Sequence, residues 1–274
     1  MALTANEKFM LERYKRTGGS GLDYGCGDGR LVGLLASDGY DFWGAESYYG
    51  SEDFRETSGA RTAAGARDRI RLLGDDFRIP FDDDTFDFVC SNQVIEHVED
   101  LRLTVRELAR VTKRGGVGIH LFPVRETVVE PHLGVPLYHR MPSSLRRPLA
   151  RRWHKAGRAN FCREEPDFDL WYRQLGPFFE SSVRLRPART VLREMKREFE
   201  VRPVEIEKLA FHRGHAVPAL PGLVPLEHRR VGMAVEARRP AVSPDSSRAV
   251  SGQMASSSTS ASPRSSSMRR TSSR

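Results

Sequence analysis

The stretch "LDYGCGDGRL" (residues 22–31) places three glycines, Gly25, Gly27 and Gly29, at alternate positions. A short apolar run precedes it, and the helix-like "GRLVGLLAS" (29–37) continues it. A glycine-rich turn at the carboxyl end of a strand lets a ligand approach the backbone closely. The stretch therefore predicts a strand, a ligand-binding turn and a helix, in that order.

Segments of strand and helix character alternate on both sides of this turn. Predicted strands cover residues 20–25, 40–46, 69–76, 86–92, 117–123 and 229–239. Predicted helices cover residues 3–14, 30–37, 101–113 and 190–200, and 52–68 is an ambiguous further helix. The alternation predicts an α/β fold, a Rossmann-like, doubly wound and mostly parallel sheet that binds its ligand at the carboxyl ends of the strands.

The chain after Pro123 departs from this alternation. Residues 124–185 are rich in proline, arginine and aromatic residues without a clear period, which predicts a lid-like insertion after the fifth strand. Within it, residues 140–158 hold seven Arg or Lys and no acid, with apolar residues at helical spacing, so a basic amphipathic helix is expected. Residues 241–274 contain 14 serines and predict a disordered tail behind a domain of residues 1–240.

Several classes of protein are excluded by composition and motif. No apolar run reaches the roughly 18 residues of a membrane span, and no signal-peptide core opens the chain, so a cytoplasmic protein is expected. The three cysteines lie far apart and predict neither disulfides nor a zinc site. The spacing of Glu130, His132 and His139 fits no compact ligand pattern, so the sequence predicts no metal.

The glycine turn also departs from the dinucleotide fingerprint. The third glycine comes one residue early, and Arg30 stands where that fingerprint has Gly or Ala. Asp23, at the end of the first strand, would repel a pyrophosphate and attract a cation. These residues disfavour a nicotinamide oxidoreductase and favour a sulfonium cofactor.

At this point the motifs resemble a known family. "LDYGCGDGRL" is similar to the first motif of class I S-adenosylmethionine-dependent methyltransferases, and the resemblance continues through "GAE" (44–46), residues 74–100 and "ELARVTKRGGVGIHLFP" (107–123). It covers residues 20–123, under half of the chain. The resemblance implies a seven-stranded sheet, S-adenosyl-L-methionine as cofactor and methyl transfer as activity.

The resemblance also implies roles at the methionine and ribose end of the cofactor. Asp23 and the backbone of Gly25 and Gly27 would hold the amino-acid end, with the acid facing its ammonium group. Glu46, which ends the second predicted strand, would bind both ribose hydroxyls.

Further roles follow for the loops after the third and fourth strands. Asp75 would accept from the adenine amino group, with Asp76 or Phe77 beside it, and Asn92 would lie beneath the methionine moiety. The acidic residues 82–84 are expected to form only a solvated loop.

Histidines are the candidate catalytic residues. A hydroxyl acceptor needs a base, and His97, His132 and His139 are the candidates, with His97 and His132 preferred. The resemblance places Glu96 and His97 beside the cofactor pocket. A purely structural His97 and a surface His132 are the alternatives.

The acceptor is the least specified part of the prediction. We expect a small-molecule or glycan-type acceptor, including anionic ones, methylated at a hydroxyl oxygen. An RNA acceptor or a peripheral membrane contact through residues 140–158 is the alternative, although the chain without its tail carries only +4 of the formal +8. A non-catalytic protein that binds S-adenosylmethionine is a further alternative. Oligomeric state is not predicted.

Overall fold

The computed structural model describes residues 3–47, 65–74, 76–159, 165–217 and 232–241. Residues Met1–Pro240 form one compact unit, and the chain divides from it at Ala241. The predicted tail and most of the ambiguous helix at 52–68 lie outside the described residues. The division of the chain into a domain of residues 1–240 and a disordered tail of residues 241–274 stays a prediction.

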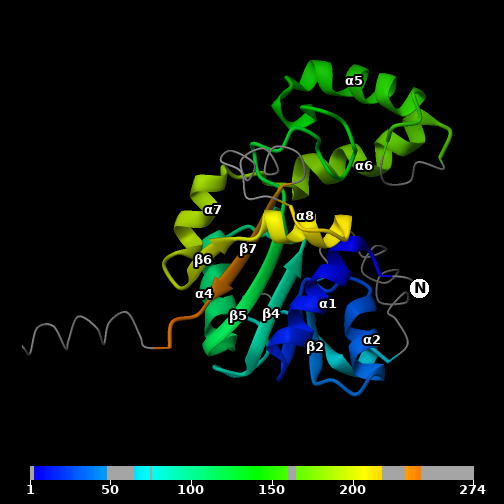
Figure 1. Cartoon of the computed structure of the whole chain (residues 1–274). Helices are drawn as coiled ribbons and strands as arrows, with labels where there is room; N and C mark the ends of the chain where they lie inside the picture. The colour runs from blue at the N-terminus through cyan, green and yellow to red at the C-terminus, as the bar shows by residue number, and fades with distance from the viewer. Residues whose placement is uncertain (1–2, 48–64, 75, 160–164, 218–231, 242–274) are drawn as a thin grey trace, which may run out of the picture. The chain divides into compact units, whose positions relative to one another are not determined.

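The centre of the first unit is a seven-stranded sheet in the order β3-β2-β1-β4-β5-β7-β6 (Figure 1). The strands are β1 (Gly21–Tyr24), β2 (Phe42–Glu46), β3 (Ile70–Leu72), β4 (Phe86–Asn92), β5 (Thr112–Phe122), β6 (Glu200–Pro203) and β7 (Met233–Arg238). Strands β1 to β5 are parallel, and β7 runs antiparallel to both of its neighbours. The predicted Rossmann-like, mostly parallel fold is confirmed.

Helices cover both faces of this sheet. They are α1 (Ala5–Thr17), α2 (Arg30–Ser37), α4 (Leu101–Val111), α5 (Ser143–Lys155), α6 (Phe168–Ser182), α7 (Ala188–Met195) and α8 (Glu205–Arg213), with short 3-10 turns at Arg67–Arg69 and Tyr138–Arg140. Residues of α4 and α7 share one buried apolar cluster with the sheet, and residues of α1 and α2 share a second. No helix in the described ranges is long and apolar enough to cross a membrane.

Some predicted boundaries are wrong. The helix predicted at 190–200 ends at Met195, and Glu200 begins β6. The helix predicted at 101–113 was expected to stop before Gly115–Gly116 and the next strand to begin at residue 117, but α4 ends at Val111 and β5 begins at Thr112. A register shift in β5 opposite Phe86–Phe88 places the glycine pair inside the strand. Glycine in a strand often marks such a bulge, so the pair interrupts the pairing rather than ending the helix.

The insertion (residues 124–185) contributes α5 and α6, which lie beyond the carboxyl ends of β4 and β5 (Figure 1). It has a small core of its own, with Tyr138, Trp171 and Phe179 buried together. The predicted basic helix is α5, and its Arg147 and Arg151 both pair with Asp169 of α6, at 2.9 and 3.0 Å. Part of the positive charge of α5 is therefore met inside the insertion.

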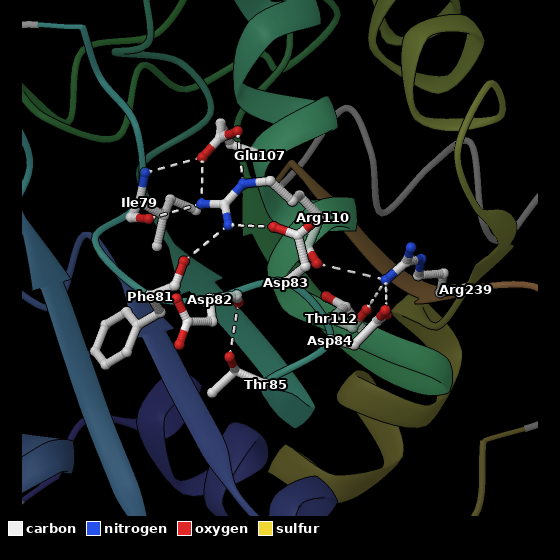
Figure 2. Close-up of polar contacts among 10 residues, drawn as sticks. All are labelled: Ile79, Phe81, Asp82, Asp83, Asp84, Thr85, Glu107, Arg110, Thr112 and Arg239. Atoms are coloured by element: carbon white, nitrogen blue, oxygen red, sulfur yellow. Dashed lines mark hydrogen bonds and ion pairs between the residues drawn. The ribbon is translucent and has the colours of Figure 1, made fainter.

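Arg110 of α4 links the loop between β3 and β4 to that helix through ion pairs and hydrogen bonds (Figure 2). Its guanidinium pairs with Glu107 at 2.7 Å and Asp83 at 2.9 Å, and it donates to the carbonyls of Ile79 and Phe81. Asp84 pairs with Arg239. Residues 82–84 are exposed, as the prediction of a solvated loop expects, and two of the three acids also form ion pairs with arginines.

Replacing Arg110 with alanine is expected to lower the free energy of unfolding by about 2–3 kcal/mol, because Glu107 and two carbonyls lose a charged donor. Urea unfolding measures this change. Arg106→Ala, at an exposed position of the same helix, is the control and is expected to change stability by less than about 0.5 kcal/mol. Equal losses in both variants would show that the network does not support the loop.

Candidate active site

The two glycines in the turn after β1 have different roles, one in internal packing and one in leaving space for a ligand. Gly25 and Gly27 both have left-handed backbone angles, with φ of 75° and 56°. A Cβ atom at Gly25 would lie 2.3 Å from Cγ2 of Val94, whereas a Cβ at Gly27 would meet nothing within 4 Å. Gly25 is thus required by internal packing, and Gly27 leaves its backbone open to a ligand.

Three acidic side chains gather behind this turn: Glu7 of α1, Asp23 of β1 and Glu46 of β2, all buried. We call them the carboxylate cluster. Glu46 accepts the backbone N–H of Gly27 at 2.6 Å and that of Ser47 at 2.8 Å, so the end of β2 holds the turn in place. Glu7 pairs with Arg30 at 3.4 Å.

Asp23 is the most perturbed member of the carboxylate cluster. Burial, followed by the charges of Glu7 and Glu46, raises the pKa of Asp23 to about 8. Its carboxyl accepts from the Cys90 thiol at 3.8 Å. The cluster therefore favours a cationic ligand, which would relieve the repulsion among its members.

The adenine end of the predicted site is only partly assembled by the described residues. Asp75 lies outside them. The structure does not bring Asp76 to the cavity described below, because its carboxylate accepts from the backbone N–H of Arg78 at 3.0 Å. Phe77 does line the cavity, with φ of 56° and half of its side chain exposed. Of the two residues predicted beside Asp75, Phe77 is the one placed to contact a ligand.

A single cavity of about 690 Å³ runs along the carboxyl ends of β1, β2 and β4. This volume lies within the range of small-molecule sites. Predicted residues that line it are Asp23, Gly25, Gly27, Glu46, Asn92 and His97. Asn92, at the end of β4, accepts from the amide of Asn6 at 2.9 Å, which fixes its orientation.

The far end of the cavity is formed jointly by the sheet and the insertion. Ser181, Ser182 and Arg184 line it from the insertion, and His97 lines it from the turn after β4. The Nδ1 atom of His97 lies 2.9 Å from the carbonyl oxygen of Ser182. Burial lowers the pKa of His97 to about 4, so its imidazole is neutral at pH 7.

His97 and His132, which we call the histidine pair, are in contact. Their Nε2 atoms lie 3.2 Å apart, although 34 residues separate them in the chain. Nδ1 of His132 lies 2.5 Å from Oε1 of Glu130, a fully buried carboxylate. The structure thus brings together both predicted catalytic histidines and adds Glu130 behind them.

Two features of this end are not apparent from the sequence. Glu96 is 2% exposed and lies 3.9 Å from Nε2 of His97, and burial raises the pKa of this carboxyl well above its usual range. His139, the third candidate base, is not in this group: its Nε2 lies 3.1 Å from the carbonyl oxygen of Arg125, and the described lining of the cavity does not include it.

Comparisons with known proteins agree with this geometry. The family model described as "Methyltransferase domain" matches residues 22–119. The chain is 37% identical over 60 residues to a demethylmenaquinone methyltransferase of Corynebacterium glutamicum (22% of this chain, 26% of that protein). It is 34% identical over 115 residues to an uncharacterised methyltransferase of Schizosaccharomyces pombe (39% and 41%).

A solved structure with a similar fold is an S-adenosylmethionine-dependent methyltransferase from Mesorhizobium loti. It is 18% identical, with a TM-score of 0.50, over 86% of this chain and 98% of that one. The chain spans less than half the length of the two curated relatives. The match to the family model ends at residue 119, before the insertion begins.

Proposed function

We propose that the protein, whose residues 22–119 match the family model described as "Methyltransferase domain", is a class I S-adenosylmethionine-dependent methyltransferase. It moves a methyl group from S-adenosyl-L-methionine to a hydroxyl oxygen of a small-molecule or glycan-type acceptor. The observation that carries the proposal is one continuous cavity. It joins the carboxylate cluster and the glycine turn at one end to His97 at the other, and His97 contacts His132.

The residues present fit this cofactor. Asp23 is a buried carboxyl at the base of the cavity, suited to the ligand's ammonium, and the open backbone at Gly27 admits the amino-acid end. Glu46 is already ordered by two backbone donors, so its carboxylate is preorganised for a ribose diol. Asn92 lines the same cavity at the end of β4, and we assign it to the methionine moiety. When bound, S-adenosyl-L-methionine supplies an activated methyl group on a sulfonium.

The histidine pair supports a hydroxyl as the acceptor. A hydroxyl must lose its proton as it is methylated, and a group that assists this loss accelerates transfer by roughly 10²–10⁴-fold. His97 lines the cavity and His132 is held against it by Glu130. Arg184, at the same end, suits an anionic acceptor.

We also propose that the insertion is the lid of the acceptor end. It supplies His132 of the histidine pair and the three lining residues Ser181, Ser182 and Arg184. Enclosure by such a segment excludes water and aligns the acceptor oxygen with the methyl group, which supplies much of the catalysis of such a displacement.

A radiolabel screen tests the proposed function. The full chain is incubated with methyl-tritiated S-adenosyl-L-methionine and panels of hydroxylated small molecules, oligosaccharides and, separately, total RNA. The expected result is label in an ether product from the first two panels. Label in RNA alone would replace the small-molecule acceptor with RNA, and no label in any panel, with cofactor binding intact, would favour the non-catalytic alternative.

Asp23 is expected to release its proton when the cofactor binds. In the free protein its pKa is raised to about 8, so at pH 7 the carboxyl is mostly protonated, and a bound ammonium favours its ionised form. Affinity should therefore rise with pH towards 8, by at most about tenfold per pH unit, and level off above it. Calorimetric titration at pH 7 in buffers of different ionisation enthalpy measures the number of protons released on binding. A binding enthalpy that does not depend on the buffer would contradict the proposed contact between Asp23 and the ammonium group. Asp23→Asn should abolish the proton release.

Glu46→Ala is expected to weaken binding of S-adenosylhomocysteine by about 1–3 kcal/mol, because charged hydrogen bonds to the ribose are lost. Glu46→Gln separates charge from shape, since it keeps the side-chain length and removes the charge. Calorimetric titration measures both variants. Wild-type affinity in a folded Glu46→Ala protein would remove Glu46 from the cofactor site.

A further inference from the structure

Three potential metal ligands converge beside the end of the cavity that the insertion helps to form: His97, which lines the cavity, and Glu96 and His132 behind it. One donor atom of each lies within 4.8 Å of the others. The two Nε2 atoms of the histidine pair are 3.2 Å apart, and Oε1 of Glu96 is 3.9 Å from Nε2 of His97. The two rings meet edge to face, at an interplanar angle of 74°.

The contacts of the two Nδ1 atoms fix the orientation of the His97 and His132 rings. A backbone carbonyl can only accept, so Nδ1 of His97 donates its proton to Ser182. The Glu130 carboxylate, which already accepts the backbone N–H groups of His132 and Leu133, also accepts from Nδ1 of His132. These contacts orient the two rings so that their Nε2 atoms face one another at 3.2 Å. Either one shared proton or one cation can occupy the space between two such nitrogen atoms.

Glu96 gives an independent indication of a missing cation. Neither of its carboxylate oxygens has a hydrogen-bond partner among the described residues, although the side chain is almost completely buried. A buried carboxyl without such a partner is costly, and each one in a native structure calls for an explanation. The nearest polar atom recorded for it is Nε2 of His97, which faces the same point as Nε2 of His132.

The donor set and its spacing select the class of ion. Two imidazoles with one carboxylate suit zinc and its transition-metal neighbours, whereas magnesium and calcium prefer oxygen ligands. Nitrogen ligands at about 2.0–2.1 Å in a tetrahedron lie roughly 3.3 Å from each other, close to the 3.2 Å between the Nε2 atoms. Oε1 of Glu96 lies 3.9 Å from Nε2 of His97 and must move closer for all three atoms to share one ion. Glu130 and Ser182 stand behind the two imidazoles, as outer acceptors do in metal sites.

We propose that Glu96, His97 and His132 bind one divalent transition-metal ion of the zinc class, with its fourth position open to the cavity and taken by the acceptor hydroxyl. This rests on the proposed function for the identity of that fourth ligand. Coordination lowers the pKa of the hydroxyl, whose proton passes to solvent. The oxygen–methyl bond then forms as the sulfur–methyl bond breaks, which leaves a neutral thioether and an unchanged metal charge. The histidine pair activates the acceptor through the ion.

The metal is tested on the full, untagged chain after removal of metals by chelation. Equilibrium dialysis against Zn²⁺ is expected to give about one equivalent per chain, and Co²⁺ is expected to show the intense visible absorption of a tetrahedral site. Glu96→Gln and His132→Ala should lose this absorption. Glu130→Gln, which changes an outer partner, should weaken metal binding by about 10–100-fold. His139→Ala, outside the group, should bind as the unaltered chain does.

Titration with S-adenosylhomocysteine in parallel separates the two proposals. Normal binding of S-adenosylhomocysteine with little Zn²⁺ retained, or with equal Zn²⁺ in the His132→Ala chain, would overturn the metal site and leave the methyltransferase standing. In that case the histidine pair would share a proton in place of the ion. Stoichiometric Zn²⁺ that depends on Glu96 and His132 supports the site, and it does so even if S-adenosylhomocysteine fails to bind and the proposed function falls.

Discussion

Replacing His97 with alanine is expected to lower kcat for methyl transfer by about 10²–10⁴-fold, the usual contribution of a group that assists loss of the acceptor proton. His132→Ala should cost about as much, because the two imidazoles are in contact and act as a unit. The double variant should lose little more than either single one. The rate is measured with the acceptor identified by the radiolabel screen.

Two comparisons make this prediction specific. His139→Ala removes a histidine of the same insertion whose ring contacts a backbone carbonyl away from the cavity, and its kcat should be unchanged. Affinity for S-adenosylhomocysteine should be unaltered in all these variants, since the carboxylate cluster and glycine turn are intact. A wild-type kcat in His97→Ala would exclude the histidine pair from catalysis.

Gly27→Ala is expected to weaken cofactor binding by about 100-fold while the protein stays folded. A methyl group at this position meets no protein atom within 4 Å, so it occupies space that the ligand needs, and overfilling a close contact costs roughly 1–3 kcal/mol. The left-handed backbone adds about 1–2 kcal/mol to the loss of folding stability. Calorimetry and urea unfolding measure the two effects separately.

Gly214→Ala is the matched control for this change. Gly214 has φ of 70° and also meets nothing within 4 Å, but it caps α8 away from the cavity lining. It should lose similar stability and keep full cofactor affinity. Equal affinities in the two variants would mean that no ligand approaches the backbone of Gly27.

The sheet and the cofactor end were predictable because their determinants are local. β4 coincides with the apolar run at residues 86–92, and α2 coincides with the periodic run after the glycine turn. Asp23 and Glu46 follow from their place at strand ends, since parallel strands bring their carboxyl ends to one edge. Asp76 was misplaced with respect to the cavity because its short side chain satisfies a backbone donor of its own turn.

The acceptor end was less predictable because it depends on distant contacts. α6 has bulky residues around its circumference and a Gly–Pro pair in its sequence, which hide a helical period. The convergence of Glu96 and His97 with His132 follows no ligand spacing, because the insertion folds back onto the turn after β4. The prediction of no metal examined Glu130, His132 and His139 together, whereas the structure groups His132 with Glu96 and His97.

The most direct test of the account is a calorimetric titration of the purified chain with S-adenosylmethionine, S-adenosylhomocysteine and NAD. Micromolar binding of both adenosyl compounds at one site per chain, with no binding of NAD, is the predicted result. Absence of binding by both adenosyl compounds, or binding of NAD in their place, would contradict it and would leave the glycine turn with the shape of a cofactor site but a different ligand or none.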